Sequence, residues 1–327
     1  MLQLFKNNHF ANALILLPLA IGLHVFLFFG SGEIHSETDG WLFRQLSGDG
    51  QIEPLWNGII SGVLVFFQAV FINRLAIIHR LNNEINILPG FLWLFWSAFH
   101  PDMMGLNGIH PALLFTLVGM NDLMRCFKKR RRSLHVFNAG LFFSLASLFY
   151  FPLLVAIVFG LFMLFVFLSI RFPEPQQYFA GLGVPYFLAL SFAYFSDSLE
   201  SLFYMQWEVH EMWGVFSGIE LGNPQWVVLG LSILLLMISI LNIPFYHAKK
   251  EIFSQRKISM LFYYVLFSIA GVLSLSQFDL TYLLLLLWPL TIFISDSLYN
   301  LKNPVIAELV IWLFIGISFF MQYEFLF

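Results

Sequence analysis

Long runs of apolar residues, separated by short polar segments, dominate the chain. A helix needs about 20 apolar residues to cross the hydrocarbon core of a membrane. Candidate spans lie near 11–30, 58–78, 86–100, 108–125, 136–151, 153–170, 179–196, 226–245, 258–276, 280–297 and 304–323. The run LLVAIVFGLFMLFVFLSI (153–170) lacks the alternation of a barrel strand. We therefore expect an all-α, polytopic membrane bundle of about eleven helices, with ten to twelve as the range.

Basic residues set the expected orientation. Cytoplasmic loops of membrane proteins carry an excess of Lys and Arg. With a cytoplasmic amino terminus and alternating spans, Arg44 is the only one of the 16 basic residues that falls outside, whereas most acidic residues fall outside. The run CFKKRRRSLHVF marks a basic cytoplasmic loop at 126–135. We predict a single transmembrane domain over 1–327 in a bacterial inner membrane, with a periplasmic carboxyl terminus.

Composition supports a membrane environment. The chain has 59% hydrophobic and 11% charged residues, whereas soluble proteins carry about 25% charged residues. The single cysteine excludes an intrachain disulfide. The basic loop is interpreted as a topological anchor that attracts anionic lipid headgroups, so membrane lipids are expected partners and nucleic acid is not. P-loop, GxGxxG, HExxH, GxSxG and CxxC motifs are missing from the sequence.

Two outer loops have substantial length. The first, 31–57, is polar and contains WLFRQL, which predicts the start of a short interfacial helix. The second, 197–225, has apolar residues at nearly helical spacing, interspersed with glutamates. We predict an amphipathic helix in this second loop, held at the outer membrane surface by Trp207 and Trp213.

Acidic residues in the first outer loop are the main candidates for chemistry. Glu33, His35, Glu37 and Asp39 follow directly on the first predicted span. A carboxylate beside apolar walls at the membrane surface is partly dehydrated, which favours action as a general base. The alternative is structural: Thr38 or Asp39 caps the helix that follows, and the other acids are solvated.

Histidines raise the question of a metal site. His35, His100, His110 and His210 are predicted on the outer side, and His24 lies in the outer half of the first span. Together with acidic residues such a set can bind iron or zinc. The sequence has no HxxxH pair on one helix. We interpret these histidines as interfacial or helix-end residues and predict neither a metal site nor a cofactor.

Polar residues inside predicted spans are functional candidates by default. They are Gln68, Asn121, Asp122, Asp296 and Glu308. Asp122 lies near Arg125 in sequence, and Asp296 and Glu308 lie near Lys302, so we predict structural ion pairs close to the inner surface.

Four stretches between Leu88 and Phe187 carry a family resemblance: LPGFLWLFWSAFHPD, PALLFTLVGMNDLMRCF, FNAGLFFSLASLFYFPLLVAIVFGLFML and RFPEPQQYFAGLGVPYF. They resemble an uncharacterised polytopic inner-membrane family of Bacteroidota, over most of the chain. That family has no established activity to carry over. Some of its members bear a carotene-oxygenase label, which the histidine pattern does not support.

More loosely, the chain is similar to the GT-C superfamily of membrane glycosyltransferases. These enzymes transfer a sugar from a polyprenyl-phosphate carrier and place an acidic residue in the first outer loop, before a short interfacial helix. The resemblance implies Asp39 or Glu37 as the general base and Arg44 on the carrier phosphate. Substrate contacts would extend to His35, Trp207 and Trp213. The chain departs from the superfamily in its length of 327 residues and in lacking a DE dipeptide, a soluble outer domain and an outer basic cluster.

Two other function classes stay open. One is a non-catalytic membrane subunit or scaffold, in which the Trp207–Trp213 segment docks another envelope protein, since aromatic residues are favoured interface anchors. The other is a transporter or lipid flippase.

Overall fold

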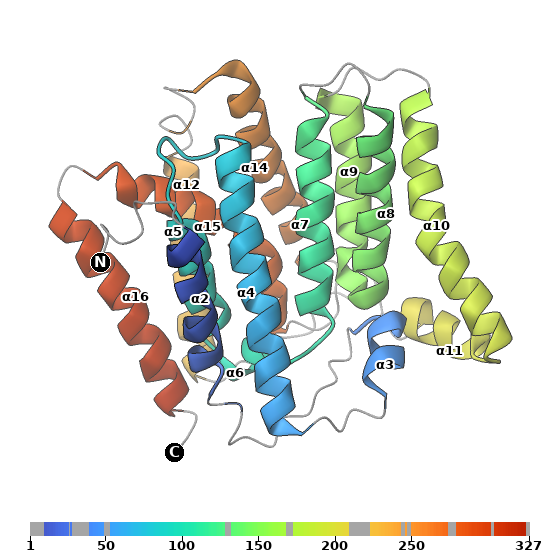
Figure 1. The fold of residues 1–327 in the computed structure, drawn as a ribbon, viewed down its shortest axis with the longest axis horizontal. Coiled ribbons are helices and arrows are strands. Elements are labelled where there is room, and N and C mark those ends of the chain that lie inside the picture. The colour runs from blue at the N-terminus through green and yellow to red at the C-terminus, as the bar shows by residue number, and fades with distance from the viewer. Residues whose placement is uncertain are drawn as a thin grey trace.

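A computed structural model shows an all-helical protein (Figure 1). The described residues are 10–25, 27, 39–48, 53–127, 132–167, 173–208, 223–242, 246, 250–273, 279–301 and 304–324. The longer helices are α2 (Phe10–Leu23), α4 (Pro54–Ile78), α5 (Leu88–Ser97), α7 (Ile109–Arg125), α8 (Ser133–Phe149), α9 (Leu154–Phe167), α10 (Pro173–Phe195), α12 (Asn223–Leu241), α14 (Ile252–Leu273), α15 (Leu283–Tyr299) and α16 (Pro304–Glu324). Each predicted span overlaps one of these helices, so the all-α prediction is confirmed.

Length and hydropathy together set apart the described helices that can cross a membrane. Five segments are long and apolar enough to cross a membrane: Pro54–Ile78, Pro173–Phe195, Ile252–Leu273, Leu280–Tyr299 and Val305–Gln322. Five shorter apolar helical segments, of 10–17 residues, lie in α2, α5, α8, α12 and in α9 with the 3-10 turn that precedes it, Phe151–Leu153. The chain therefore has the character of a multi-pass membrane protein.

The two loops predicted to lie outside the membrane differ in part from their predicted forms. A short helix, α3 (Trp41–Ser47), occupies the WLFRQL segment, and α4 begins at Pro54, inside the predicted loop 31–57. The predicted amphipathic helix of 197–225 is short among the described residues: α11 (Leu199–Phe203) is followed by one π-helical turn, Tyr204–Glu208. Residues 209–222 lie outside the described part of the chain.

The bundle has two opposite ends, and they differ in the groups that they carry. At one, Arg80 pairs with Glu251, Arg132 with Glu174, His135 with Asp122 and Lys250 with Asp296. We call this the basic end. At the other lie α3, the four-residue helix α6 (Pro101–Met104) and α11 (Figure 1). We call this the loop end.

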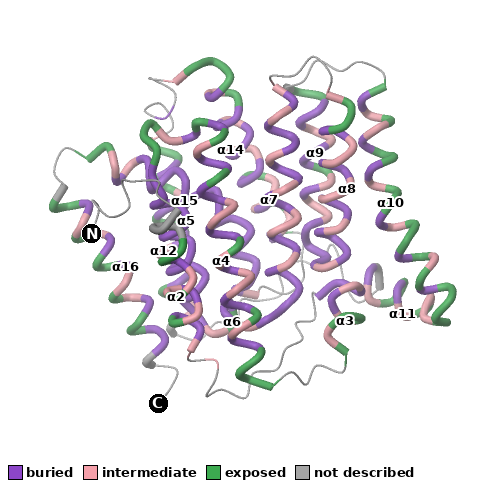
Figure 2. Tube along the Cα trace, viewed as in Figure 1, coloured by how far each residue is buried: buried purple, intermediate pink, exposed green. Residues whose placement is uncertain are grey.

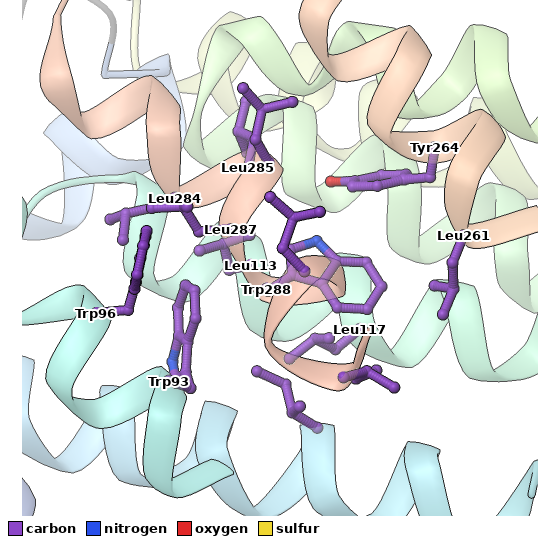
Figure 3. Close-up of a cluster of buried hydrophobic side chains, with 14 of the residues drawn as sticks. Trp93, Trp96, Leu113, Leu117, Leu261, Tyr264, Leu284, Leu285, Leu287 and Trp288 are labelled. Carbon is purple, nitrogen blue, oxygen red and sulfur yellow. The ribbon is translucent and has the colours of Figure 1, made fainter. Parts of the chain in front are cut away.

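Helix α15 lies in the centre of the bundle. Of its most apolar window 89% is buried, against 33–44% for the other four long segments. Trp288 of α15 packs on Tyr264 of α14, with ring centroids 5.2 Å apart. Side chains from α5, α7, α14 and α15 converge around this tryptophan (Figure 3). Helices at the periphery, such as α10 and α16, are instead exposed along one side (Figure 2).

Helix α5 is enclosed as well, and it is shorter than the predicted span 86–100. All ten of its residues are buried, so it contacts protein rather than lipid. Asn73 of α4 accepts a hydrogen bond from the Gly90 N–H through its Oδ1, at 2.7 Å. A Cβ on Gly90 would collide with Asn73 and with the Ala69 carbonyl. The missing side chain therefore allows α5 to approach α4 closely.

Glycines also set the contact between α8 and α10. A Cβ on Gly140 would meet the Tyr178 carbonyl oxygen, and a Cβ on Gly181 would meet the Phe137 carbonyl oxygen. Small residues let two helix backbones approach closely, which increases packing where lipid gives no hydrophobic drive between helices.

This contact predicts the effect of adding one methyl group to α10. Gly181→Ala should destabilise the protein by about 1–3 kcal/mol, because the new Cβ overlaps the Phe137 carbonyl. Gly183→Ala is the matched control, because a Cβ at Gly183 meets nothing within 4 Å. Thermal unfolding of both variants in detergent measures the difference. Equal melting temperatures would contradict the close approach of α8 and α10.

Candidate functional site

Asp39, the first predicted general base, lies inside the protein at the loop end. Its side chain is fully buried, and Oδ1 accepts a hydrogen bond of 2.7 Å from the Gly108 N–H. Gly108 is the N-cap of α7, so the carboxylate lies at the positive end of that helix dipole. The N-cap of α3 is Gly40, without a side-chain cap. Asp39 thus caps α7. Thr38, the other residue expected to cap α3, lies outside the described residues, so the structural alternative for this loop stays a prediction.

Three backbone segments meet around Asp39. Asp39 and Tyr150 form an isolated antiparallel bridge, in which the Gly40 N–H donates to the Phe149 carbonyl at 2.9 Å. A Cβ on Gly40 would overlap the Leu148 carbonyl, and a Cβ on Gly108 would overlap the Phe149 carbonyl, both at the end of α8. Both glycines are thus required for the close approach of the first loop, the start of α7 and the end of α8.

Gln206 connects this junction to α8 and α10. Its Oε1 accepts from the Trp41 N–H at 3.4 Å, and its Nε2 donates to the Ser147 carbonyl at 2.9 Å. The Ser147 hydroxyl in turn lies 2.8 Å from the Tyr186 hydroxyl. Gln206 is fully buried. The π-helical turn therefore fixes the start of α3 against the bundle.

Polar residues of α4 stabilise the irregular backbone between α6 and α7. Asn57 accepts from the Leu106 N–H at 2.8 Å, and Ser61 donates to the Met104 carbonyl. Gln68 donates to the His110 carbonyl at 2.7 Å and accepts from the Trp93 indole at 3.0 Å. Gln68, a functional candidate in the sequence, thus has a structural role here.

Only some of the other predicted site residues are described, and these lie near Asp39 in sequence or beside Gln206. Arg44 is half-buried on α3, one turn beyond Gly40, whose carbonyl accepts from the Arg44 N–H. Trp207 follows Gln206 in the π-helical turn. Glu37, His35 and Trp213 lie outside the described residues. With no exposed surface on Asp39, an acceptor hydroxyl reaches its carboxylate only if the surrounding backbone moves.

A second polar cluster, at the basic end, was not predicted. Lys257 of α14 is 3% exposed, and its Nζ lies 3.0 Å from Nδ1 of His79. Nε2 of His79 lies 3.1 Å from Oδ1 of Asn121 on α7. An ammonium donates only, so His79 accepts at Nδ1 and donates at Nε2, as a neutral imidazole does. The predicted span begins at residue 258, so Lys257 was expected in a loop. In the structure α14 begins six residues earlier, at Ile252, and includes Lys257.

Asp122 and Asp296 have partners that differ from those predicted. Asp122 lies 2.6 Å from Nδ1 of His135 on α8, so the predicted pair with Arg125 is wrong. Asp296 accepts from the Asn83 N–H at 2.7 Å and lies 3.5 Å from Lys250. The predicted partner Lys302 is outside the described residues.

Lys250 lies outside the long helices and is nearly enclosed. Its side chain is 5% exposed, and its Nζ donates to the Leu81 carbonyl. Burial lowers the pKa of Lys250, while the Asp296 carboxylate acts in the opposite direction. Lys250 and Asp296 neutralise each other's buried charge. This pairing is a structural role, because either charge would be costly to bury alone.

Comparisons with known proteins add no assignment. No protein-family model, no curated protein and no solved structure matches this chain. Within the described ranges, no three or more His, Cys, Asp or Glu side chains come together as a metal site. The two family resemblances stay predictions.

The burial of Asp39 predicts a role in stability. Asp39→Ala should lower the free energy of unfolding by about 2 kcal/mol, because the buried Gly108 N–H loses a charged acceptor. Asp39→Asn, which keeps an acceptor oxygen, should lose less. Asp102→Ala is the control, since Asp102 is at the same end but its side chain is 45% exposed. If unfolding in detergent shows no loss for Asp39→Ala relative to this control, the cap contributes little.

Proposed function

We propose that the chain is a non-catalytic membrane subunit that holds an envelope-biogenesis partner at the outer face of a bacterial inner membrane. The observation that carries this proposal is the burial of Asp39. The one predicted base among the described residues is engaged at the start of α7 and lacks surface for a substrate. What then distinguishes the loop end is its exposed aromatic residues.

Those aromatic residues lie at the end of α10, at the end of α11 and at the start of the π-helical turn. Phe195 is 85% exposed, Phe203 50% and Tyr204 55%. Trp41 of α3 packs nearby, edge to face on Phe192 of α10. Aromatic side chains of this kind are favoured anchors in protein interfaces. We name the set of Phe195, Phe203 and Tyr204 the aromatic edge, and we propose that it contacts the partner.

The proposed topology has about eleven crossings, an amino terminus in the cytoplasm and a carboxyl terminus in the periplasm. Several arginines and lysines meet at the basic end, which supports placing that end inside. Gln322, near the end of α16, donates to the Ala98 carbonyl at 2.8 Å, which supports an outer carboxyl terminus. Short helices such as α5 then cross within protein rather than lipid.

A GT-C-like sugar transfer from a polyprenyl-phosphate donor is the second candidate. The position of α3 favours it, because a short helix directly follows Asp39, as the resemblance implies. It would require Asp39 to leave the α7 terminus, or Glu37 to act as the base. A Glu37→Gln variant that lost an envelope glycan at unchanged protein abundance would support transfer over the subunit role.

Cysteine labelling tests the topology. The chain has one cysteine, Cys126, which is buried, so Cys126→Ser gives a background without thiols. In intact spheroplasts, a membrane-impermeant maleimide should label Leu46→Cys, which replaces a 71%-exposed side chain on α3. It should label Glu251→Cys, at the basic end, only after permeabilisation. The reverse pattern would overturn the proposed orientation.

Crosslinking and co-purification test the partner. Phe203→Ala combined with Tyr204→Ala should reduce a specific crosslinked complex at least tenfold in yield, because two central aromatic anchors are each worth about 2 kcal/mol. Phe320→Ala is the control, since Phe320 is 62% exposed on α16, away from the aromatic edge. A chain that always migrates alone, or equal loss in the control, would count against this surface.

A further inference from the structure

A histidine begins the four-residue helix α6 at the loop end. His100 is the N-cap of α6, and its Nδ1 accepts a hydrogen bond of 3.3 Å from the Asp102 N–H. Pro101, between them, has no N–H to donate. Capping residues usually accept through a side-chain oxygen, and an imidazole nitrogen can replace that oxygen only while it carries a lone pair. The cap of α6 therefore requires Nδ1 of His100 to be unprotonated.

The same nitrogen faces a second partner that requires the opposite state. Nδ1 of His100 lies 3.1 Å from Oδ2 of Asp102. A carboxylate oxygen only accepts, so this contact is a hydrogen bond only when Nδ1 carries a proton. An imidazolium, protonated at both nitrogens, makes this second contact and cannot accept from the Asp102 N–H. The two contacts therefore exclude each other.

The two contacts are also of similar strength. A helix N-cap and an ion pair with a half-exposed partner stabilise a protein by comparable amounts, and the Asp102 side chain is 45% exposed. The His100 side chain is 5% exposed. Histidine is the side chain that changes its charge in the physiological pH range. Protonation of His100 thus decides which of the two contacts forms.

Charged residues at the adjacent ends of the elements packed on α6 are acidic. Helix α6 contacts α4 and the 3-10 turn Leu280–Tyr282. Glu53 precedes α4, and Asp279 precedes the 3-10 turn. Helix α16 ends at Glu324, and the first turn of α12 is uncharged. A proton on His100 therefore adds a positive charge beside helix ends that carry acidic residues.

Asp102 connects His100 to α12. Its Oδ2, the same atom that faces His100, accepts from Nε2 of Gln225 at 3.2 Å. Gln225 lies in the first turn of α12. The segment around α6 is held separately by Gln322 of α16 and Ser61 of α4. A change of partner at Oδ2 therefore acts on the start of α12, while those other two helices keep their bonds.

We propose that His100 makes the contact between α6 and α12 sensitive to acid. With a neutral ring, His100 caps α6 and leaves the Asp102 carboxylate to Gln225. With a protonated ring, the cap is lost and the imidazolium draws the carboxylate to itself, which loosens the first turn of α12. In the orientation proposed above, this corner faces the outside of the inner membrane, so the contact responds to the external pH.

Hydrogen–deuterium exchange of the purified full chain in detergent, measured by mass spectrometry, tests this proposal. After correction for the intrinsic exchange rate, residues 98–108 and the first turn of α12 should lose protection about fivefold between about pH 8 and about pH 5, the size expected for loss of one N-cap. The middle of α4 should keep its protection. This comparison is made on the wild-type chain, so it does not depend on the folding of a variant. Equal protection of 98–108 at both pH values would overturn the proposal.

Two variants separate the parts of the mechanism. His100→Asn keeps a side-chain acceptor for the Asp102 N–H that acid does not remove, so protection of residues 98–108 should become independent of pH. Gln225→Leu removes the contact to α12, so the response of α12 should vanish while that of 98–108 remains. A pH response in His100→Asn as large as in the wild-type chain would overturn the role of His100. A response of α12 that persists in Gln225→Leu would overturn the connection to α12.

Discussion

Backbone groups that leave helical geometry inside a membrane bundle must find partners in the protein, because lipid offers none. The segment between α5 and α7, residues 98–108, is not a continuous helix, and its backbone groups need partners from several other parts of the protein. Asn57 and Ser61 of α4 bind it from one side, Asp39 binds its last residue, and Gln322 of α16 binds its first carbonyl. Asn57, Ser61 and Gln322, polar residues within apolar helices, therefore help to make this segment stable.

The same demand bears on function. A carboxylate directly after the first span is the expected position of a general base in a GT-C-like transferase. Asp39, however, is held by the Gly108 N–H and lies beside the end of α8. Its chemistry is that of an anion at a helix start, where it offsets the partial positive charge of the peptide dipoles. An acidic residue directly after a first apolar helix can thus have a structural role.

Much of the fold could be predicted from the sequence, because apolar runs and basic loops specify where helices start and stop. The partners of the polar residues could not, because contacts such as Asp39 to Gly108 or His79 to Lys257 join segments far apart in the chain. Lys257 was assigned to a loop because hydropathy underestimates the length of α14, whose first turns are polar. His24 and His110 were recognised as outer histidines, but the complete burial of both side chains is visible only in three dimensions.

The central position of α15 has a consequence for biosynthesis. Helices enter the membrane in the order of translation, and α15 follows α5, α7 and α14, the helices against which its side chains pack. The middle of the bundle is therefore completed late, after its walls are in place. Until Trp288 arrives, the apolar surfaces of the earlier helices have only lipid or an insertion chaperone to cover them. Nascent chains stalled before residue 280 should accordingly be the natural targets of membrane quality control.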